Sequence, residues 1–414
     1  MGPVLVIDKS ALQSFSFEEL LILHTNFHLN IVPILVIEIL GDIKKPAYGS
    51  LSREKVSELA RKVFPFDSAV NMHYQDLLRA SLLGYEVPLG RRPILAGGNQ
   101  VRTTQGEIGM IFEESPEEKA LRRWRNGDFN AAEEILGEKW RESTRNLDLE
   151  EAKRNLQVLT PKSPIIKDRS HLNQVITNTL EDDGLQRDLL KIIMVQFHLS
   201  TRDAQQSFFR WETSGCPPLR VFAPYALHCL RVNLFFMLGL LQDLISTRST
   251  NRVDMEYLYY LPFCMVFCSE DKFHCQIAPF FLGENQQFVR GADLKDDLKK
   301  RILGQSDTHT DTNHDQSLIT QLWNQFMARP RENYRNFADT MDKESNKKMA
   351  EFIKSKIRNA EPSEDSSVRN SQQADFVIKK FETAWGDVCP CGSGKLFGEC
   401  HGPKVVQKQQ PHGS

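Results

Sequence analysis

The chain has 414 residues, of which 40% are hydrophobic and 26% are charged, so it contains enough apolar residues for a sizeable core. This length predicts two or three domains. A net charge of −2 excludes a strong overall attraction for nucleic acid, so any contact with phosphates must depend on local basic patches. Eight cysteines in so long a chain predict a reducing compartment, where clustered thiols bind metals or take part in chemistry instead of forming disulfides.

The sequence predicts a cytoplasmic protein without a membrane span. Its first residues, MGPVLVIDKSALQ, lack the basic region, the long apolar run and the small-residue cleavage site of a secretory signal. The most apolar segment, residues 222–245, carries four polar or charged side chains: His228, Arg231, Asn233 and Asp243. Its uncharged part is shorter than the roughly 18 to 20 residues of a membrane span, so we expect a buried core helix there.

The N-terminal forty residues predict alternating strands and helices. VLVID is a continuous apolar run that ends in an acid, which is typical of a strand buried on both faces. SFEELLILHTNF follows, with Ser16 and Glu19 at the spacing of a helix capping box. A second apolar run, NIVPILVIEILGDI, begins β-branched and ends with Glu38 and Asp42 four residues apart, on one face if this part is helical.

The middle of the chain has a different character. From about residue 44 to 250, polar stretches with a helical period predominate. After them, residues 253–261 predict a short helix and residues 263–268 a strand that is followed by Ser269, Glu270 and Asp271. CQIAPFFLG predicts a last short strand, residues 304–317 a polar loop, and residues 359–373 have the composition of a linker.

The end of the chain contains a pattern typical of a zinc site. Cys389, Cys391, Cys400 and His401 form two close pairs separated by a Gly-rich turn. Four such nitrogen and sulfur ligands would close a tetrahedral structural site with no open position. The pattern C-x-C-x-S-G with a later C-H resembles the SEC-C motif, which is appended to many unrelated bacterial proteins. The resemblance implies a structural Zn²⁺ and a surface for a protein partner or a ribosome-associated component.

Several acidic residues follow apolar segments, where an ionised carboxylate would be partly buried. Asp8 ends a buried strand, where an ionised group is costly without a cation or hydrogen-bond donors. Asp271 repeats this arrangement after a second apolar run, and Asp254 precedes it by seventeen residues (271 − 254 = 17). The carboxyl ends of parallel strands gather ligand sites, so Asp8 and Asp271 are candidate site residues, and Glu38 lies in the tail of the second apolar run.

This set resembles the acids of the PIN-domain nucleases. That family has an Asp at the end of strand one followed by a small hydroxyl residue, a Glu in a helix, an Asp-headed helix, and a strand that ends in Thr/Ser-x-Asp. The matching residues here are Asp8 with Ser10, Glu38, Asp254, and Ser269 with Asp271. The chain departs from the family in the more than two hundred residues between Glu38 and Asp254. It also has Lys9 directly after the first acid, with a side chain expected to point away from Asp8.

The resemblance implies an α/β fold, with a PIN-like parallel-sheet core interrupted by a large mainly helical insertion and followed by a small C-terminal zinc knuckle. The implied divisions are a first core part at residues 1–43, the insertion at 44–249, a second core part at 250–290, a helical extension with a polar loop at 291–358, a linker at 359–376 and the SEC-C motif at 377–404.

The resemblance also implies a metal-dependent endonuclease that hydrolyses phosphodiester bonds, with RNA favoured over DNA. Converging carboxylates repel one another unless a divalent cation enters, and oxygen ligands suit Mg²⁺ or Mn²⁺. Asp8, Glu38, Asp254 and Asp271 would hold the metal, Ser10 and Ser269 would orient carboxylates by hydrogen bonds, and Asp42 and Glu270 would be auxiliary acids. Arg91 and Arg92, in the loop-like LGRRPIL, would bind substrate. The alternative is a non-catalytic adaptor on a degenerate PIN-like scaffold, with the SEC-C segment as its partner-binding module.

The stretch CMVFCSEDKFHC, residues 264–275, offers a competing zinc site. In a strand, Cys264 and Cys268 would lie about 13 Å apart at roughly 3.3 Å per residue. Sulfurs that share a zinc lie within about 4 Å of each other, given Zn–S bonds near 2.3 Å. We therefore interpret both cysteines as small core side chains. His274 and Cys275 remain as an adjacent pair without an assigned role.

Overall fold

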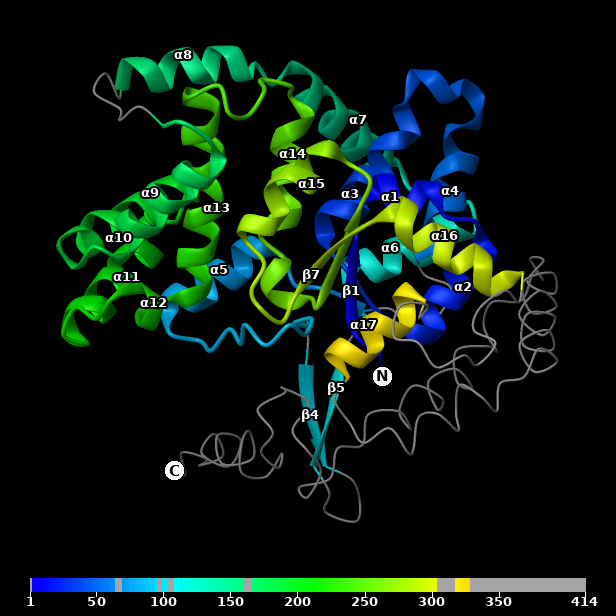
Figure 1. The fold of residues 1–414 in the computed structure, drawn as a ribbon, viewed down its shortest axis with the longest axis horizontal. Coiled ribbons are helices and arrows are strands. Elements are labelled where there is room, and N and C mark those ends of the chain that lie inside the picture. Colours follow the sequence, from blue (N-terminus) through cyan, green and yellow to red (C-terminus); the bar gives the residue numbers. More distant parts are fainter. Residues whose placement is uncertain are drawn as a thin grey trace, which may run out of the picture. The chain divides into compact units, whose positions relative to one another are not determined.

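A computed structural model describes residues 2–63, 69–95, 98–102, 108–112, 114–159, 166–303 and 317–327. The chain divides into two compact units. The first unit comprises Met1–Ala96 and Glu114–Asp296, and the second comprises Gly97–Glu113 and Asp297–Ser414. The first unit contains a parallel sheet and most of the helices, which confirms the predicted mixed α/β class (Figure 1).

Five parallel strands form the sheet of the first unit, in the order β3-β2-β1-β6-β7. Their bounds are β1 Val4–Ile7, β2 His28–Ile31, β3 Ala69–Val70, β6 Val266–Ser269 and β7 Gln287–Arg290. β1 is central and its four residues are at most 1% exposed, which explains its unbroken apolar sequence. The edge strand β3 comes from the range that the sequence predicts as a helical insertion.

The order of the strands reverses around β1. The chain passes from β1 to β2 on one side, and returns to the other side of β1 only with β6. In open parallel sheets, ligands bind beyond the carboxyl ends of the two strands at such a reversal. Here the residue after β1 is Asp8, whose amide donates a hydrogen bond to the Cys268 carbonyl of β6 at 3.1 Å.

Four helices follow β1 and β2, and one of them, α2, begins at the capping box that the sequence predicts. Their bounds are α1 Lys9–Ser14, α2 Phe17–Asn26, α3 Pro33–Gly41 and α4 Ser52–Val63, with 3-10 turns at Asp42–Lys44 and Pro46–Leu51. Ser16 and Glu19 form the expected capping box at the start of α2. α3 begins at Pro33, where the missing N–H of proline costs nothing because first-turn amides have no partner within the helix.

The middle of the chain is mainly helical. Its helices are α5 Tyr74–Leu83, α6 Pro116–Arg125, α7 Ala131–Asn146, α8 Leu149–Leu159, α9 Arg169–Glu181, α10 Gln186–Gln196, α11 Thr201–Thr213, α12 Leu219–Phe222, α13 Pro224–Leu241 and α14 Thr250–Leu258, with 3-10 turns at Asp183–Leu185 and Leu261–Phe263. Figure 1 shows α9 to α13 gathered together, in green, with the long helix α13 among them. α13 packs against α5, α8, α9 and α12.

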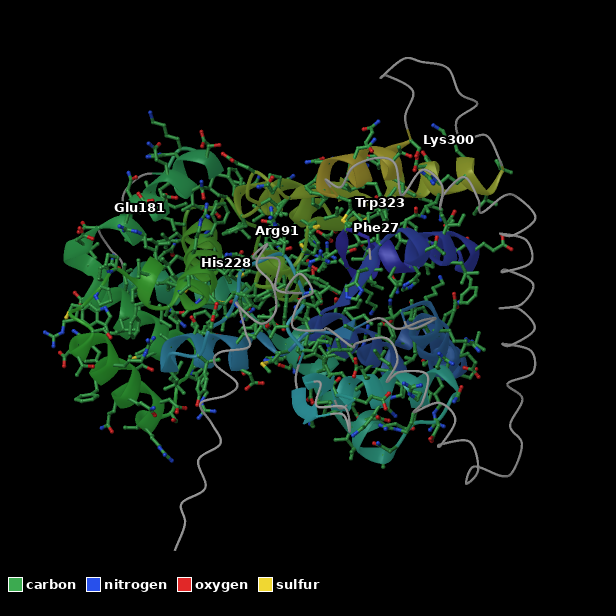
Figure 2. The ribbon with its side chains drawn as sticks, turned by 90° about the horizontal axis from the view of Figure 1, so that it is seen from below. Phe27, Arg91, Glu181, His228, Lys300 and Trp323 are labelled. Atoms are coloured by element: carbon green, nitrogen blue, oxygen red, sulfur yellow. The ribbon has the colours of Figure 1, made fainter. Side chains whose placement is uncertain are left out.

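α13 is the helix predicted from the apolar segment 222–245. Within the described part of the chain, it alone is long and apolar enough to cross a membrane, and 56% of its apolar window is buried inside the fold. Its polar side chains have partners: His228 Nε2 lies 2.9 Å from the Leu258 carbonyl oxygen, and Arg231 donates to the Phe280 carbonyl oxygen at 2.8 Å. His228 is labelled within this helical group in Figure 2.

The predicted strand CQIAPFFLG is wrong. Helix α15, Lys272–Ile277, and a 3-10 turn at Ala278–Phe280 occupy this segment, and the next strand is β7. The helix starts because the Asp271 carboxylate accepts a hydrogen bond from the Phe273 amide at 2.6 Å. Pro279 then lacks the N–H that a central strand would need. Strand β6 also begins later than predicted, at Val266 instead of Phe263.

The second unit contains an antiparallel pair, β4 Gly98–Arg102 and β5 Ile108–Phe112, and helix α17, Leu318–Phe326. Helix α16, Gly291–Ile302, crosses from the first unit into the second. Within the second unit, the Asp297 carboxylate accepts hydrogen bonds from the Leu318 and Ile319 amides at 2.9 and 3.1 Å. These bonds satisfy amides at the start of α17, which would otherwise lack partners.

Gly137 allows α7 to lie directly against α3. A Cβ atom at this position would come 2.8 Å from the Leu40 carbonyl oxygen, closer than real Cβ contacts. We expect Gly137→Ala to lower the free energy of unfolding by about 1–3 kcal/mol through overpacking, seen as a lower midpoint of thermal denaturation. The control is Gly283→Ala, whose Cβ would meet only the Gln286 side chain at 3.6 Å. Equal midpoints for the two variants would contradict this packing argument.

Candidate active site: an acidic cluster at the ends of β1 and β6

The Asp8 carboxylate lies at the centre of the site and is only 3% exposed. Its Oδ1 accepts a hydrogen bond from the Ala11 amide at 2.8 Å, which caps α1. Its Oδ2 accepts from the hydroxyls of Ser10 at 2.7 Å and Ser269 at 2.6 Å. The two serines therefore make the contacts with a carboxylate that the sequence predicts, and they link the end of β1 to the end of β6.

His274, in α15, completes this arrangement, and its hydrogen bonds fix both of its protons. The Ser269 hydroxyl donates to Asp8 and accepts from the Asp271 amide at 2.9 Å, so His274 Nδ1, 2.8 Å from that hydroxyl, acts as a donor. Nδ1 also lies 3.3 Å from Asp8 Oδ2. On the other side of the ring, Nε2 donates to the Asp254 carbonyl oxygen at 2.7 Å. Both nitrogens donate, which is the pattern of a protonated imidazolium.

The charges of Asp8 and His274 stabilise each other. Burial alone would raise the pKa of Asp8, but the hydrogen bond and charge of His274, with hydrogen bonds from Ser269 and Ala11, hold that pKa below its ordinary value of 3.8. Burial likewise opposes the protonated form of His274, yet Asp8 outweighs it and raises the pKa of the histidine to about 9. The pair is thus ionised at neutral pH.

Glu38 reaches the same region from the middle of α3. Its Oε2 accepts a hydrogen bond from the Tyr257 hydroxyl, in α14, at 2.5 Å. Burial raises the pKa of Glu38, and the negative charge of Asp8 raises it further, while Lys9 and Tyr257 act in the opposite direction. The net direction is upward because burial is the largest of these effects.

Asp254 is the acid of the site that lacks a donor. It lies inside α14, one turn beyond its start, so the predicted Asp-headed helix is wrong. Its Oδ2 is buried and has no hydrogen-bond partner within the part of the chain that the structure describes. Burial, together with the negative charges of Asp271, Glu38 and Asp8, raises the pKa of Asp254 to about 7. The name acidic cluster denotes Asp8, Glu38, Asp254 and Asp271.

The remaining acids cap neighbouring elements. Asp271 follows β6, is partly exposed and caps α15. Glu270 accepts a hydrogen bond from the Ala292 amide, and its own amide donates to the Ser10 hydroxyl at 3.1 Å. Glu270 is therefore engaged in holding the start of α16 beside the ends of the two strands.

Lys9 does not point away from the site. Because β1 ends at Ile7, Lys9 is the first residue of α1, and the alternation of a strand does not extend to it. Its Nζ donates to the Glu38 carbonyl oxygen and contacts Asp42 Oδ1, each at 2.8 Å. Asp42 is only 1% exposed, and its Oδ2 has no hydrogen-bond partner among the described residues. Lys9 thus supplies a positive charge between the cluster and Asp42.

The structure brings all four predicted acids together, but each carboxylate also has other surroundings. Within the described residues, no three His, Cys, Asp or Glu side chains are arranged so that they could hold a metal ion. Asp8 accepts donors on both oxygens, whereas Asp254 has a free buried oxygen. The donor set is entirely oxygen, which is the chemistry that Mg²⁺ and Mn²⁺ prefer.

Arg91 and Arg92, predicted to bind substrate, lie at the opposite edge of the sheet. The Arg91 amide donates to the Pro262 carbonyl oxygen, before β6, and its guanidinium donates to the Asn285 carbonyl oxygen, before β7. Arg92 lies close enough to His28, the first residue of β2, to lower the pKa of that histidine, for which burial is the larger cause. Asp8 and Asp271 of the acidic cluster instead follow the carboxyl ends of β1 and β6. Figure 2 labels Arg91.

The cysteines of the stretch 264–275 are not arranged as a metal site. Cys264 and Cys268 are fully buried, as the sequence predicts for core side chains. Burial raises the pKa of both thiols, which keeps them protonated. Cys275 is a free thiol in α15.

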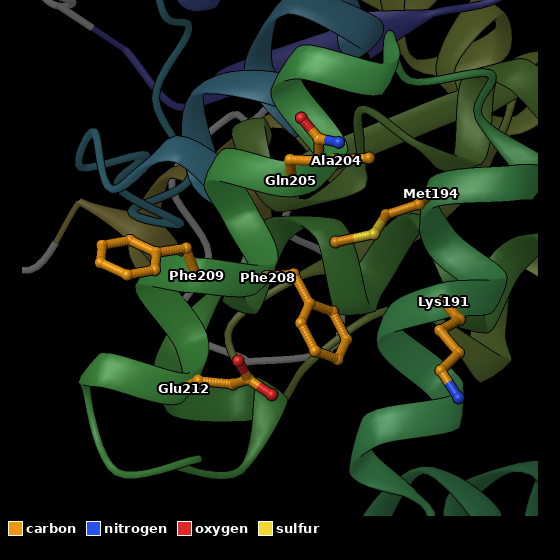
Figure 3. A pocket seen from close by; sticks show the side chains of 7 residues that line it. All are labelled: Lys191, Met194, Ala204, Gln205, Phe208, Phe209 and Glu212. Carbon is orange, nitrogen blue, oxygen red and sulfur yellow. The ribbon is translucent and has the colours of Figure 1, made fainter.

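A hollow of about 460 Å³ lies elsewhere, against α10 and α11. Figure 3 shows Met194, Phe208 and Phe209 among its lining side chains, with Lys191 and Glu212 also present. This lining offers apolar surface with one acid and one amine, in contrast to the neighbouring carboxylates of the acidic cluster. We therefore assign the candidate chemistry to the acidic cluster.

Comparison with known proteins identifies a motif at the end of the chain. Residues 387–403 match the SEC-C motif, which confirms the resemblance predicted there. This segment contains the proposed zinc ligands Cys389, Cys391, Cys400 and His401, and it lies outside the described residues. No curated protein matches the chain, and no solved structure matches it.

The sequence analysis does not predict His274 and Tyr257 as site residues, although the sequence contains a signal for each. His274 lies three residues after Asp271, in the first turn of a helix that Asp271 caps, so its ring returns toward the end of β6. Tyr257 lies three residues after Asp254 and shares its helix face. Neither signal points to Lys9, whose contacts depend on where β1 ends.

The raised pKa of His274 predicts a pH dependence of stability. A histidine with a higher pKa in the folded state stabilises the fold below its ordinary pKa of 6.5, and this contribution is lost as the pH rises through about 9. We expect urea denaturation with a chelator present to show lower stability at pH 9 than at pH 6.5, and His274→Asn to reduce this difference. The matched control is His198→Asn, at an exposed histidine. A pH dependence unchanged in His274→Asn would contradict the ion pair with Asp8.

Proposed function

We propose that this protein is a metal-dependent endonuclease with a PIN-like core, acting on phosphodiester bonds and on RNA in preference to DNA. The observation that carries the proposal is that Asp8, Glu38 and Asp254 come from three separate elements to lie near one another and near Asp271, beside a reversal of strand order. The hydroxyls of Ser10 and Ser269 support it further, because both donate to the first acid of the set.

The oxygen ligands of this cluster suit a divalent cation, but their present positions do not form a site for one. Asp254 offers a buried oxygen without a donor, and its pKa of about 7 results from burial and then from the negative charges of the neighbouring acids. Since no three described side chains converge on one point, a cation would have to draw carboxylates together as it binds. Asp254, Asp271, Glu38 and Asp8 would hold Mg²⁺ or Mn²⁺. When bound, such an ion polarises a phosphodiester and makes water a stronger nucleophile.

The side chains of the cluster have distinct tasks in this proposal. Asp8 keeps its negative charge at every physiological pH, because its pKa is lowered by His274 against the effect of burial. Asp254 has a buried oxygen without a donor among the described residues, so it is the acid best suited to take up a cation. Tyr257 holds the Glu38 carboxylate through its hydroxyl. Removing any one acid therefore removes a different part of the site.

The endonuclease is tested by incubating the full chain with labelled single- and double-stranded RNA and DNA in Mn²⁺. We expect cleavage that a chelator abolishes, and that falls about 100-fold or more in Asp8→Asn, Asp254→Asn and Asp271→Asn, because each substitution removes a negative charge that would hold the metal. The matched control is Asp183→Asn, which changes an exposed carboxylate of a 3-10 turn. Cleavage retained in all three cluster variants would overturn the catalytic role of these acids.

A second candidate is a non-catalytic adaptor on a PIN-like scaffold. It is favoured by Lys9, which pairs with Asp42 beside the cluster, and by His274, which pairs with Asp8. Buried carboxylates paired with such groups need no metal for stability. In this proposal the SEC-C segment, with Zn²⁺ held by Cys389, Cys391, Cys400 and His401, docks a protein partner or a ribosome-associated component.

The adaptor predicts no calorimetric signal for Mn²⁺ binding at the cluster and no cleavage of any nucleic acid. It predicts capture of a partner from cell extract by the tagged full chain, and loss of that capture in Cys389→Ser and Cys400→Ser, since each removes a zinc ligand. Cys216→Ser, at an exposed thiol outside the motif, is the control. Mn²⁺ binding that is lost in Asp254→Asn would favour the endonuclease instead.

A further inference from the structure

A groove of about 490 Å³ opens beside the acidic cluster, and Asp271 is part of its lining. One part of the lining comes from the end of β6 and from α15, and includes Glu270 and Lys272. Another part comes from the helical middle of the chain: Arg169, at the start of α9, and Arg248, between α13 and α14. The groove therefore brings residues distant in the sequence to the cluster.

The three cations of this groove are available for a ligand. Arg248 and Lys272 are exposed, and within the described part of the chain neither forms an ion pair, although Glu270 and Asp271 line the same groove. Arg169 is held by one contact, in which its Nε donates to the Leu244 carbonyl oxygen at 3.0 Å. By contrast, other exposed cations of the middle region are paired, such as Arg187 with Glu212 at 3.0 Å.

We propose that this groove binds the phosphodiester backbone of a nucleic acid strand and positions it across Asp271. The inference rests on the proposed endonuclease and assigns its substrate-binding residues: Arg169, Arg248 and Lys272. They take the place of Arg91 and Arg92, which lie at the opposite edge of the sheet.

The charges of the groove explain why it suits a strand. A phosphate that approaches Asp271 and Glu270 is repelled unless cations lie beside it, and arginine and lysine provide the usual contacts to phosphate oxygens. The three cations come from three segments of the chain, so they are suited to successive phosphates instead of one compact anion. The groove also contains the side chains of Ser10, Ser246 and Asn251, which are polar and uncharged.

The test measures binding without cleavage. Fluorescence anisotropy of labelled single-stranded RNA and DNA oligonucleotides would be recorded with the full chain in chelator, over a range of salt concentrations. We expect Arg248→Glu with Lys272→Glu to weaken binding at least tenfold. The slope of log Kd against log salt should also fall by about 1 for each phosphate that a cation no longer neutralises. RNA and DNA arms distinguish the two kinds of strand.

The control is the double variant Arg220→Glu with Lys300→Glu, which makes the same change in net charge at exposed residues outside the groove lining. Unchanged binding in the control, with weaker binding in the groove variant, supports the proposal. Equal weakening in both variants, or no binding of either strand by the unaltered chain, overturns it. If the groove variant alone loses binding while Mn²⁺ gives no cleavage, the groove assignment holds and the endonuclease fails. If the unaltered chain cleaves in Mn²⁺ and the groove variant still binds as tightly as the unaltered chain, the endonuclease holds and the groove assignment fails.

Discussion

The buried carboxylate of Asp8 is the constraint on which the rest of the site depends. An ionised group at the end of a central strand must be compensated, because its transfer from water into the core is costly. The compensation comes from the Ala11 amide, from Ser10 and from two residues of the distant C-terminal half, Ser269 and His274. Asp8 and Ser269 are 261 positions apart, so the carboxylate links the two parts of the sheet.

From Asp8 the hydrogen bonds continue through the site without interruption. His274 connects Asp8 to the main chain of α14 at Asp254, and Tyr257 on the same helix connects α14 to Glu38 in α3. Four elements are thus held by donors and acceptors whose positions depend on one another. Such a network holds the Asp8 and Glu38 carboxylates in place, because each is bonded to a partner that is itself held. The same network gives a stable scaffold, which is why both proposed functions share it.

The sequence predicts the elements that carry the site better than it predicts the contacts between them. Periodicity and capping place the strand before Asp8 and the start of α2, since both depend on neighbouring residues. The two-residue strand β3 escapes prediction, because its pairing with β2 is determined by tertiary packing and not by local propensity. The groove also escapes, because Arg169 and Arg248 meet Asp271 only after the helical middle of the chain has folded.

The charge that remains uncompensated lies on the side of Asp254 and Asp271. Lys9 is engaged with Asp42 and with the main chain of α3, and His274 is engaged with Asp8. Toward Asp254, His274 donates only to the main-chain carbonyl, so the Asp254 carboxyl keeps a buried oxygen without a donor. Asp271 lines the groove that holds three cations without ion pairs among the described residues. A scaffold alone does not require this excess of negative charge beside unpaired positive charge. In the proposed endonuclease, an anionic strand bound by the cations and brought to a metal at the two acids would use both.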